Sequence, residues 1–399
     1  MRRVLAAGLA LYAIVFLLVT TSYSRQIFGL NSGRDIFRFD TFGDEQLWTD
    51  TLQLHTAVQT LRPVDALDAG LKVDAQALPR EVIQAIQAGG VDLTDPAVTA
   101  LLLSLDAVVG VKARVSTSGT IERLGITCAL CHSTVDNSLT GGIGRRLDGW
   151  PNRDLNVGAI VAMSPVLTLG QKGVFNSWGR GKFDPRLQAF DGDSFITLND
   201  TTFPVVIPPA YGLREVPYET FTADGPISYW NNYVGVTQMG GQGSFHDPRM
   251  PLTITQEPDL VTPQLRALLR YQLSLQAPAP PRGSFDRVAA RRGQLLFHTI
   301  ARCAECHTGP AFTDVGDGLI PVLHAPSETG MEEEYASRSV TKNYRTSPLR
   351  GIWQHPPYFH DGSAADLMAV VNHYNQPTVL NLQLTEAQKS DLVEYLKSL

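Results

Sequence analysis

Two short cysteine–histidine motifs are the residues of this chain best suited to carry out chemistry. The motifs read C-A-L-C-H (Cys128, Cys131 and His132) and C-A-E-C-H (Cys303, Cys306 and His307). Together they contain all four cysteines of the chain. A C-x-x-C-H segment is the attachment signature of c-type haem, because its two thiols add to the vinyl groups of the porphyrin and its histidine binds the iron. The motifs therefore predict two covalently bound c-type haems.

Three other uses of these cysteines agree less well with the spacing. A structural zinc site needs four ligands, and neither motif has a second Cys/His pair nearby at zinc spacing. A thioredoxin-like redox pair would need one C-x-x-C in a β-α-β context, which is absent. Disulfides would have three connectivities to choose from, but they would leave the paired histidines unexplained.

The N-terminus carries the pattern of an export signal. Arg2 and Arg3 precede an apolar run over residues 4–19 (VLAAGLALYAIVFLLV), and such a pattern directs secretion. No clean A-x-A cleavage site follows, so residues 1–24 are predicted to be a signal peptide or an uncleaved membrane anchor, with a buried core helix as the third alternative. The positive-inside rule keeps the arginine pair cytoplasmic and places the rest of the chain in the periplasm.

The composition is that of a globular chain with more than one domain. At ~100–200 residues per domain, the 399 residues suggest at least two. Hydrophobic residues at 43% are sufficient for a core. The formal net charge is −6 without a basic stripe, so no nucleic-acid partner is expected. Only the N-terminal run is apolar enough to cross a membrane, which excludes a polytopic membrane protein.

Helical patterns before the first motif predict a mainly α fold. Helices are expected over residues 44–61, 78–88 and 95–109, where apolar residues recur at helical spacing behind an acidic residue or a proline. After the motif, residues 137–260 are rich in Gly, Pro and Asn. Such long loops usually carry function or wrap a cofactor.

The second half of the chain is predicted to be a separate small helical domain. A Pro-rich spacer, residues 277–283 (APAPPRG), separates an N-terminal haem domain with a helical extension (25–276) from a C-terminal haem domain (284–399). A helix over 285–301 leads into the second motif. A closing helix over 385–399 begins with a capping-box pattern.

A weak internal repeat follows the two motifs. Leu213-Arg214 leads to Phe221 and Asp224-Gly225, and Leu349-Arg350 leads to Phe359 and Asp361-Gly362. Each Asp-Gly pair precedes a stretch that can form a helix and that ends in a residue able to bind a metal. Two motifs with two such elements suggest a duplicated haem domain.

One C-terminal segment resembles a known family. Residues 347–374 read SPLRGIWQHPPYFHDGSAADLMAVVNHY, which is similar to the P-x-L-R…P-Y-F-H-D-G-S segment of the bacterial di-haem cytochrome c peroxidase/MauG superfamily. The similarity is specific over 285–399, looser over 120–245 and absent before residue 120. It implies two cytochrome c-like domains, in which the N-terminal haem reacts with peroxide and the C-terminal haem passes or stores electrons.

The resemblance also implies iron ligands. His132 and His307 match the two proximal ligands, and Tyr374 falls at the sixth-ligand position of the second haem, where MauG-like members have tyrosine and conventional peroxidases of the family have methionine. A phenolate would lower the haem potential, whereas a thioether would raise it. The alternative is that Tyr374 only packs, with no sixth ligand or with one of three other residues in its place: His373, Met368 or Met331.

For the first haem, the match with the family is looser. Met239, in the segment GVTQMGG, follows an Asp-Gly element as the family's methionine ligand does. Its rivals are Met163 and His246, and a lone methionine is often only a core residue.

The family's peroxide-reacting haem instead keeps one face open beside Gln and Glu side chains. The weak candidates for this acid–base role are Glu215 and Gln238, which could equally be surface or capping residues. Ala223 precedes the first Asp-Gly pair, where the family has tryptophan, so the resemblance does not by itself establish peroxidase activity.

Two further features of the family have only partial counterparts. A tryptophan could bridge the two haems, although each candidate could equally be a core residue: Trp150, Trp178, Trp230 and Trp353. The resemblance also allows a calcium ion between the haem domains, although His355 stands where the family has threonine.

Two functions follow from these features. The first is peroxide reduction at the N-terminal haem, which needs an open iron position and a distal acid–base group. The second is electron transfer without catalysis, with both irons six-coordinate and Met239 closing the first. Either function requires a redox partner, which is expected to be a small cytochrome, a cupredoxin or a quinone-linked donor. Oxygenase chemistry on an organic substrate is a third possibility without support from individual residues.

Overall fold

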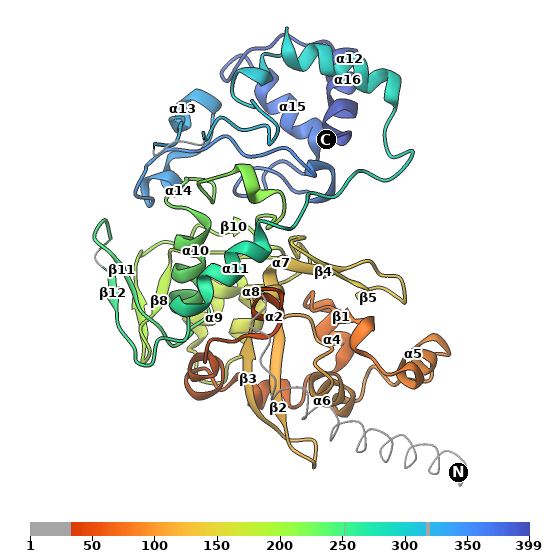
Figure 1. The fold of residues 1–399 in the computed structure, drawn as a ribbon, viewed down its shortest axis with the longest axis vertical. Coiled ribbons are helices and arrows are strands. Elements are labelled where there is room, and N and C mark those ends of the chain that lie inside the picture. Colours follow the sequence, from red (N-terminus) through yellow and green to blue (C-terminus); the bar gives the residue numbers. More distant parts are fainter. Residues whose placement is uncertain (1–32, 251, 317–319) are drawn as a thin grey trace.

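The structure is a computed structural model that describes residues 33–250, 252–316 and 320–399. An N-terminal unit (residues 33–276) and a C-terminal unit (residues 284–399) lie one above the other (Figure 1). The predicted signal peptide or anchor, residues 1–24, lies outside the described residues. Within the described part of the chain, no helix is both long and apolar enough to span a membrane.

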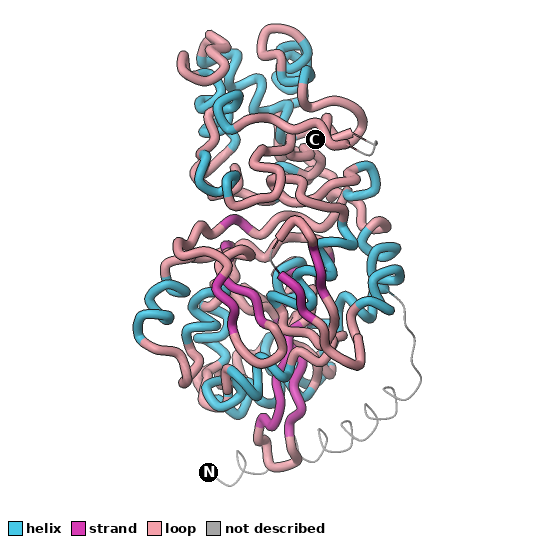
Figure 2. Tube along the Cα trace, turned by 90° about the vertical axis from the view of Figure 1, so that its left-hand side faces the viewer, coloured by secondary structure: helices cyan, strands magenta, loops and turns pink. Residues whose placement is uncertain are grey.

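The N-terminal unit mixes helices with short strands, so the prediction of a mainly α fold is wrong for this half of the chain. The described strands form six two-stranded sheets, all within this unit (Figure 2). The longest ladder pairs β2 (Val111–Val115) with β3 (Ile121–Ile126) in antiparallel fashion. Their sequences, VKARV and IERLGI, place apolar and charged residues in alternation around a Ser-Gly turn, which is the pattern of a hairpin.

The remaining strands are two or three residues long. They are β1 (Val73–Asp74), β4 (Ser133–Val135), β5 (Ile143–Gly144), β6 (Arg146–Asp148), β7 (Lys182–Phe183), β8 (Gln188–Phe190), β9 (Phe195–Thr197), β10 (Val205–Val206), β11 (Phe245–Asp247) and β12 (Leu252–Ile254). Several of these strands lie within residues 137–260, which were expected to be loops, and their pairing joins neighbouring loops by backbone hydrogen bonds. The β4–β6 pair directly follows the first C-x-x-C-H motif.

The helices of the N-terminal unit are short. They are α2 (Gly33–Phe39), η1 (Gln46–Thr51), α3 (Leu54–Val58), α4 (Pro63–Asp68), η2 (Ala75–Ala77), α5 (Arg80–Gln87), α6 (Pro96–Ser104), α7 (Ala129–His132), α8 (Val157–Ala162), α9 (Leu169–Asn176), η3 (Leu213–Glu215), α10 (Ile227–Tyr233), η4 (Val234–Gln238), η5 (Thr262–Gln264) and α11 (Leu265–Gln272). The helices expected over 78–88 and 95–109 correspond to α5 and α6. The second ends early because Asp106 and Gly110 adopt positive φ and turn the chain into β2.

The helix expected over 44–61 is divided into two. Its first part, η1, is a π-helix, and α3 follows after Gln53, whose φ of 52° is left-handed and interrupts the helical path. The division places Trp48 at 5% exposure, with its indole N–H donating to the carbonyl oxygen of Met239 at 2.8 Å. Because η4 is also a π-helix, two wide turns meet here, and such turns are frequent at functional sites.

The C-terminal unit contains helices and loops, and no strand among its described residues, as predicted. Its two long helices are α12 (Arg287–His298) and α16 (Glu386–Lys397). They cross at Gly293, where a Cβ would lie 2.0 Å from the carbonyl oxygen of Asp391. The predicted capping box is confirmed, because the hydroxyl of Thr385 accepts from the N–H of Gln388, whose side chain accepts from the N–H of Thr385.

The other helices of this unit are α15, which packs on α16, and several single turns. They are η6 (Cys303–Glu305), α13 (Pro326–Thr329), α14 (Glu333–Ser337), η7 (Ile352–Gln354) and α15 (Leu367–Asn375). The predicted spacer, residues 277–283, has no helix or strand and runs between α11 and α12. The carbonyl oxygen of Pro278 accepts a hydrogen bond from the indole of Trp353 at 3.1 Å, so the spacer also contacts the C-terminal unit.

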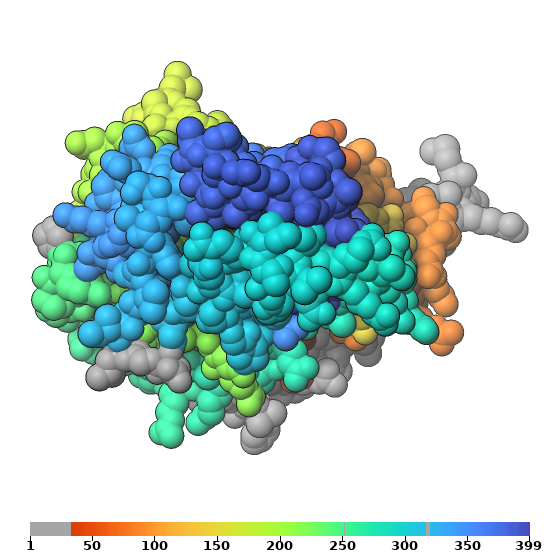
Figure 3. Space-filling view, turned by 90° about the horizontal axis from the view of Figure 1, so that it is seen from above, coloured from red at the N-terminus to blue at the C-terminus, as the bar shows by residue number. Residues whose placement is uncertain are grey.

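Buried ion pairs join the two units. The guanidinium of Arg338 donates to the carboxylate of Asp184 at 3.0 Å, with the two side chains 7% and 0% exposed. Arg345 pairs with Glu219 at 3.3 Å. In both pairs the C-terminal unit supplies the cation and the N-terminal unit supplies the acid. Seen from above, the C-terminal unit covers the middle of the N-terminal unit (Figure 3).

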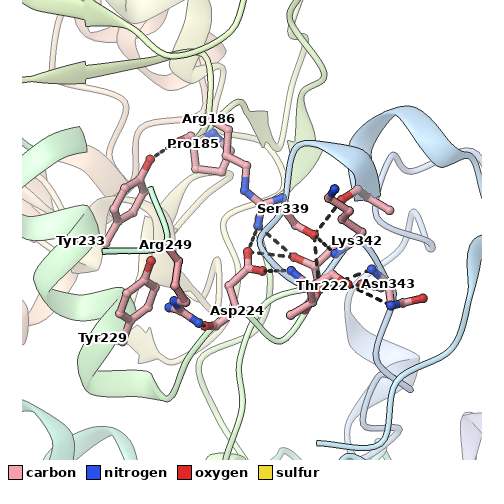
Figure 4. A network of polar contacts seen from close by, with 12 residues as sticks. Pro185, Arg186, Thr222, Asp224, Tyr229, Tyr233, Arg249, Ser339, Lys342 and Asn343 are labelled. Atoms are coloured by element: carbon pink, nitrogen blue, oxygen red, sulfur yellow. Dashed lines mark hydrogen bonds and ion pairs between the residues drawn. The ribbon is translucent and has the colours of Figure 1, made fainter. Parts of the chain in front are cut away.

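A third polar cluster reinforces this contact (Figure 4). Arg186 donates to the carboxylate of Asp224 and to the hydroxyl of Thr222, which is 2.9 Å away. From the C-terminal unit, the hydroxyl of Thr341 donates to the carbonyl oxygen of Thr222 at 2.7 Å. Because these groups are largely buried, the two units are held in one arrangement by bonds that water cannot easily replace.

Candidate functional site

The first C-x-x-C-H motif lies in the wall of a large cavity in the N-terminal unit. The cavity, with its open mouth, measures about 1800 Å³, and all three motif residues line it. The motif is held in place by α7 and by backbone bonds, since the N–H of Gly149 donates to the carbonyl oxygen of His132 at 2.8 Å. Most other lining residues are aliphatic or aromatic, as a porphyrin face requires.

The imidazole of His132 is arranged as a metal ligand. Its Nδ1 lies 3.1 Å from the carbonyl oxygen of Pro208. A carbonyl can only accept, so Nδ1 carries the proton and Nε2 keeps its lone pair for a metal. Burial lowers the pKa of His132 to about 4, so the ring is neutral at neutral pH.

The four cysteines are free, and three of them have strongly raised pKa values. Burial raises the pKa of Cys128, Cys131 and Cys303 to about 12, so these side chains remain thiols. A zinc site needs thiolates. Within the described residues, only one set of three His, Cys, Asp or Glu ligand atoms lies close enough to share a metal ion: Cys306, Asp314 and His324. Thioether attachment to haem fits both motifs better than a zinc site.

The predicted sixth-ligand candidate of the first haem lies in this cavity, and its rivals do not. Met239 is 5% exposed and lines the cavity directly after η4. Met163 lines a separate apolar cavity, and His246 is exposed on β11, where its Nδ1 lies 2.8 Å from the hydroxyl of Thr253. Met239 is therefore the one of these three candidates that lines the first cavity.

Of the two acid–base candidates, only Gln238 reaches the cavity. Its amide nitrogen donates to the carbonyl oxygen of Gln188 at 2.9 Å, which fixes the side chain in the cavity wall. Glu215 is exposed and lines neither this cavity nor the one in the C-terminal unit. The left-handed Gly212 starts the turn η3, which directs Leu213 inward and leaves Glu215 at the surface.

A third acid–base candidate, Glu219, was not found from the sequence. Its side chain is 12% exposed and lines the cavity, with one oxygen paired to Arg345 and the other, Oε1, buried without a hydrogen-bond partner. Burial raises the pKa of Glu219 to about 7, against the opposing effect of Arg345. The repeat contained the one available signal, because Glu219 lies between its Leu-Arg and Asp-Gly pairs.

The second motif lies in a similar cavity in the C-terminal unit. This cavity measures about 1670 Å³ with its mouth and is lined by Cys303, Cys306 and His307. The Nδ1 of His307 lies 3.0 Å from the carbonyl oxygen of Phe312. Burial lowers the pKa of His307, so this ring also presents a neutral Nε2.

Tyr374 faces this second cavity, as the resemblance implied. It lies near the end of α15, and burial raises its pKa to about 12. Among its rivals, only Met331 lines the cavity; His373 points to the carbonyl oxygen of Thr329 at 2.8 Å, and Met368 packs in the core of the unit. The phenol and one thioether are thus the two remaining candidates.

His355, where calcium was considered, lies between the two units. Its Nδ1 is 3.1 Å from the hydroxyl of Tyr211, and burial lowers its pKa to about 3. Calcium prefers oxygen ligands, and the imidazole of His355 supplies only nitrogen. A calcium ion between the units stays a prediction.

The four tryptophans considered as bridges between the haems separate into two pairs. Trp178 and Trp230 line the first cavity. Trp150 and Trp353 pack edge to face at 5.9 Å and line neither haem cavity. The second pair therefore joins the two units without reaching either site.

Comparisons with known proteins match the chain in part. A family model described as RoxA-like, cytochrome c-like matches residues 343–381. The methylamine utilization protein MauG of Methylorubrum extorquens is 32% identical over 156 residues, which are 33% of this chain and 42% of that protein. The cytochrome-c peroxidase IdrP1 of a Pseudomonas species is 27% identical over 183 residues, which are 34% of this chain and 48% of that protein.

Among solved structures, a MauG-like protein associated with microbial copper homeostasis shares 17% identity at a TM-score of 0.36, covering 50% of this chain and 74% of that one. The chain spans about half the length, or less, of the curated relatives it matches. The family match overlaps the P-Y-F-H-D-G-S segment, which confirms the resemblance found in the sequence. The family match and the sequence similarity to the MauG and IdrP1 proteins support the resemblance to the di-haem cytochrome c peroxidase/MauG superfamily, and with it c-type haem as the cofactor.

Proposed function

We propose that this protein reduces hydrogen peroxide in the N-terminal cavity, with electrons passed through a second haem in the C-terminal cavity. The observation that carries the proposal is Glu219, a mostly buried carboxyl with one unpartnered oxygen in the wall of the first cavity. No other acidic side chain in that wall combines these properties with a pKa raised to about 7.

Glu219 can exchange a proton with peroxide near neutral pH. A general acid–base group works best when its pKa is close to the working pH. The bound haem supplies an iron position at which peroxide is held and reduced. Glu219 accepts a proton from one peroxide oxygen and returns a proton to the departing oxygen. Two electrons and two further protons then complete the conversion of peroxide to two water molecules.

Arg345 and Gln238 position the reacting groups. The ion pair with Arg345 fixes one carboxylate oxygen of Glu219 and leaves Oε1 for the substrate. The amide of Gln238, tied to Gln188, lies in the same cavity wall. The apolar residues around them limit the water that could compete for the carboxyl.

The C-terminal cavity is suited to electron storage. Tyr374 reaches it beside His307, and a phenolate ligand would stabilise oxidised iron relative to a thioether. Because burial keeps the Tyr374 pKa at about 12 without a metal, the phenol would lose its proton only on binding one.

The second candidate is an electron-transfer cytochrome without catalysis. It is favoured by Met239, which is buried and lines the first cavity, where a thioether ligand would close the iron to peroxide. In that case Glu219 would only tune the haem potential.

Electron paramagnetic resonance of the holoprotein separates the two candidates. The peroxidase predicts a high-spin signal from the first haem in the half-reduced protein, together with peroxide consumption that depends on a reduced small cytochrome. Two low-spin haems in both redox states without peroxide consumption would establish the electron-transfer function instead.

The setting of this reaction is also proposed. The N-terminal arginine pair and apolar run indicate export to the periplasm, with residues 1–24 either removed or retained as an anchor. The electron donor is proposed to be a small cytochrome, a cupredoxin or a quinone-linked protein. Reduction of the purified holoprotein by each class in turn, followed at the Soret band, tests this assignment.

A further inference from the structure

Three rings stand between the two cavities. Tyr335, on α14, lines the N-terminal cavity, whereas Tyr344 and His360 line the C-terminal cavity. The ring centroid of His360 lies 5.1 Å from that of Tyr335 and 5.1 Å from that of Tyr344. We call these three residues the ring cluster. Tyr335 and His360 are stacked and His360 and Tyr344 are tilted by 45°, so the three rings form a continuous contact from one cavity to the other.

The ring cluster is buried and held in place. Tyr335, Tyr344 and His360 are 1%, 6% and 4% exposed. The N–H of Val206 in β10 donates to the carbonyl oxygen of His360 at 2.7 Å, and the backbone of Tyr344 pairs with that of His324. Such fixed, buried rings need little rearrangement when an electron is removed.

A proton path leads from Tyr344 to the surface. Its hydroxyl donates to the carbonyl oxygen of Glu332 at 3.0 Å and also lies 3.3 Å from Nε2 of His360, to which it can turn. The same nitrogen lies 3.0 Å from a carboxylate oxygen of Glu332. The side chain of Glu332 is 37% exposed. The phenolic proton can therefore be exchanged for one that reaches solvent, which an oxidised tyrosine requires because its cation is strongly acidic.

The surroundings of the two tyrosines differ in charge. The guanidinium of Arg186 lies over the ring of Tyr335 at 5.0 Å, and a positive charge there disfavours removal of an electron. Tyr344 instead has an imidazole and a carboxylate within reach. Of the two tyrosines, Tyr344 is therefore the one whose oxidised, radical form is more stable.

We propose that the ring cluster is the electron relay between the two haem cavities, with Tyr344 as a reversible tyrosyl radical. This inference rests on the proposed function, which supplies the oxidant, the haem of the first cavity after reaction with peroxide. Tyr344 gives one electron through His360 and Tyr335 to that oxidant. Its hydroxyl turns to His360 and its proton passes to the free Nε2, and the imidazolium formed then gives that proton to Glu332. Tyr344 is restored by one electron, which a reduced haem bound in the second cavity would supply, and Glu332 returns the proton through His360.

The test uses the full-length holoprotein and two oxidants. Peroxide tests the relay in turnover, and flash photo-oxidation with ruthenium tris-bipyridine oxidises the ring cluster without peroxide chemistry. After either treatment, rapid freezing and electron paramagnetic resonance should reveal a tyrosyl radical whose hyperfine pattern changes when ring-deuterated tyrosine is incorporated. Peroxide consumption is recorded in parallel.

Three variants locate the radical. Tyr344→Phe should lose the signal, and Glu332→Gln should lower its yield, because the amide cannot take up the proton. Tyr229→Phe is the matched control, since Tyr229 also makes a buried hydrogen bond, 2.8 Å to Asp247, but lines neither haem cavity. It should keep the radical at the wild-type yield.

The outcomes separate this inference from the proposed function. If peroxide is consumed but the radical is absent, or persists in Tyr344→Phe, the relay is wrong. If peroxide is not consumed while photo-oxidation still yields a radical that Tyr344→Phe abolishes, the peroxidase assignment fails and Tyr344 remains the redox-active ring of the cluster. If neither oxidant produces the radical, the relay is wrong.

Discussion

The N-terminal and C-terminal cavities are built on one plan. In each, a C-x-x-C-H histidine lies against a backbone carbonyl through Nδ1, at 3.1 Å for His132 and 3.0 Å for His307. In each, a left-handed glycine beside the Leu-Arg pair starts a 3₁₀ turn: Gly212, with a φ of 70°, precedes Leu213, and Gly351, with a φ of 73°, follows Arg350. The shared plan supports the duplication that the sequence repeat suggests.

The cavities differ in the ionisable side chain that lines each wall at the corresponding position of the sequence repeat. Counted from its Leu-Arg pair, Glu219 occupies the same place in the first copy as His355 in the second. The pKa of Glu219 is raised to about 7 and that of His355 is lowered to about 3, both mainly by burial. The same scaffold thus offers a group that exchanges protons near neutral pH in one cavity and a permanently neutral ring in the other, which favours proton chemistry in the first.

Removal of either cysteine pair should have the largest effect, because it should abolish covalent haem attachment in one cavity and leave the other unchanged. Cys128→Ala with Cys131→Ala should leave one covalently bound haem, and Cys303→Ala with Cys306→Ala should leave the other, because each pair forms its own thioethers. Mass spectrometry and the Soret absorbance of the purified protein measure this. A variant that retains two covalent haems contradicts the assignment.

Glu219→Gln tests whether the carboxyl in the wall of the first cavity takes part in peroxide turnover. Loss of a positioned acid–base group costs about 10²–10⁴-fold in rate, so peroxide turnover should fall by that factor while both haems stay bound. The control is Glu215→Gln, at the exposed neighbouring site, which should turn over peroxide at the wild-type rate. Equal rates in Glu219→Gln and wild type would remove Glu219 from the mechanism.

Arg338→Leu tests how firmly the two cavities are held together. It leaves the fully buried carboxylate of Asp184 without its partner, and the loss of one member of a buried pair costs about 3–5 kcal/mol. Urea denaturation should show this loss in the free energy of unfolding. Arg114→Leu, which breaks an exposed pair with Glu122, should change the free energy far less.

Tyr374→Met should affect only the second cavity. If Tyr374 binds iron, replacement of a phenolate by a thioether raises the potential of that haem. A spectroelectrochemical titration should show one potential rising and the other unchanged. Two unchanged potentials would mean that the phenol only packs.

The pH dependence of stability should show the two wall groups with opposite signs. The raised pKa of Glu219 makes the folded state bind more protons than the unfolded state between the ordinary glutamate pKa of 4.5 and about 7, so its contribution to stability falls as pH rises through that window. The lowered pKa of His355 makes the folded state bind fewer protons between about 3 and 6.5, so its contribution rises with pH there.

Thermal unfolding of the two variants at several pH values separates these contributions. Glu219→Gln should flatten the decline towards pH 7, and His355→Gln should flatten the rise below 6.5. Parallel melting curves for wild type and Glu219→Gln would show that the carboxyl ionises normally.

Local patterns predicted much of the C-terminal unit. The capping box at Thr385, the helix leading into the second motif and the Asp-Gly element at Asp361 are signals that a few neighbouring residues carry by themselves. The position of Tyr374 near the end of α15 came from the resemblance, and the structure brings it to the cavity.

The N-terminal unit was predicted less well, because distant contacts override local preference there. The helical pattern over 44–61 gives way to η1 and α3 because Trp48 is drawn to the carbonyl oxygen of Met239, 191 positions along the chain. Glu215 and Glu219 look alike in the sequence, and only the fold buries the second.

The sequence by itself determined the cofactor chemistry, because thioether attachment and proximal ligation need only five consecutive residues. It also suggested a duplication, because two copies of a weak repeat can be read along the chain. Only the tertiary structure decided which acid lies in the first cavity and which rings join the two cavities. Those properties depend on burial and on contacts between segments far apart in sequence, such as Arg345 with Glu219 and His360 with Tyr335, and local patterns do not encode them.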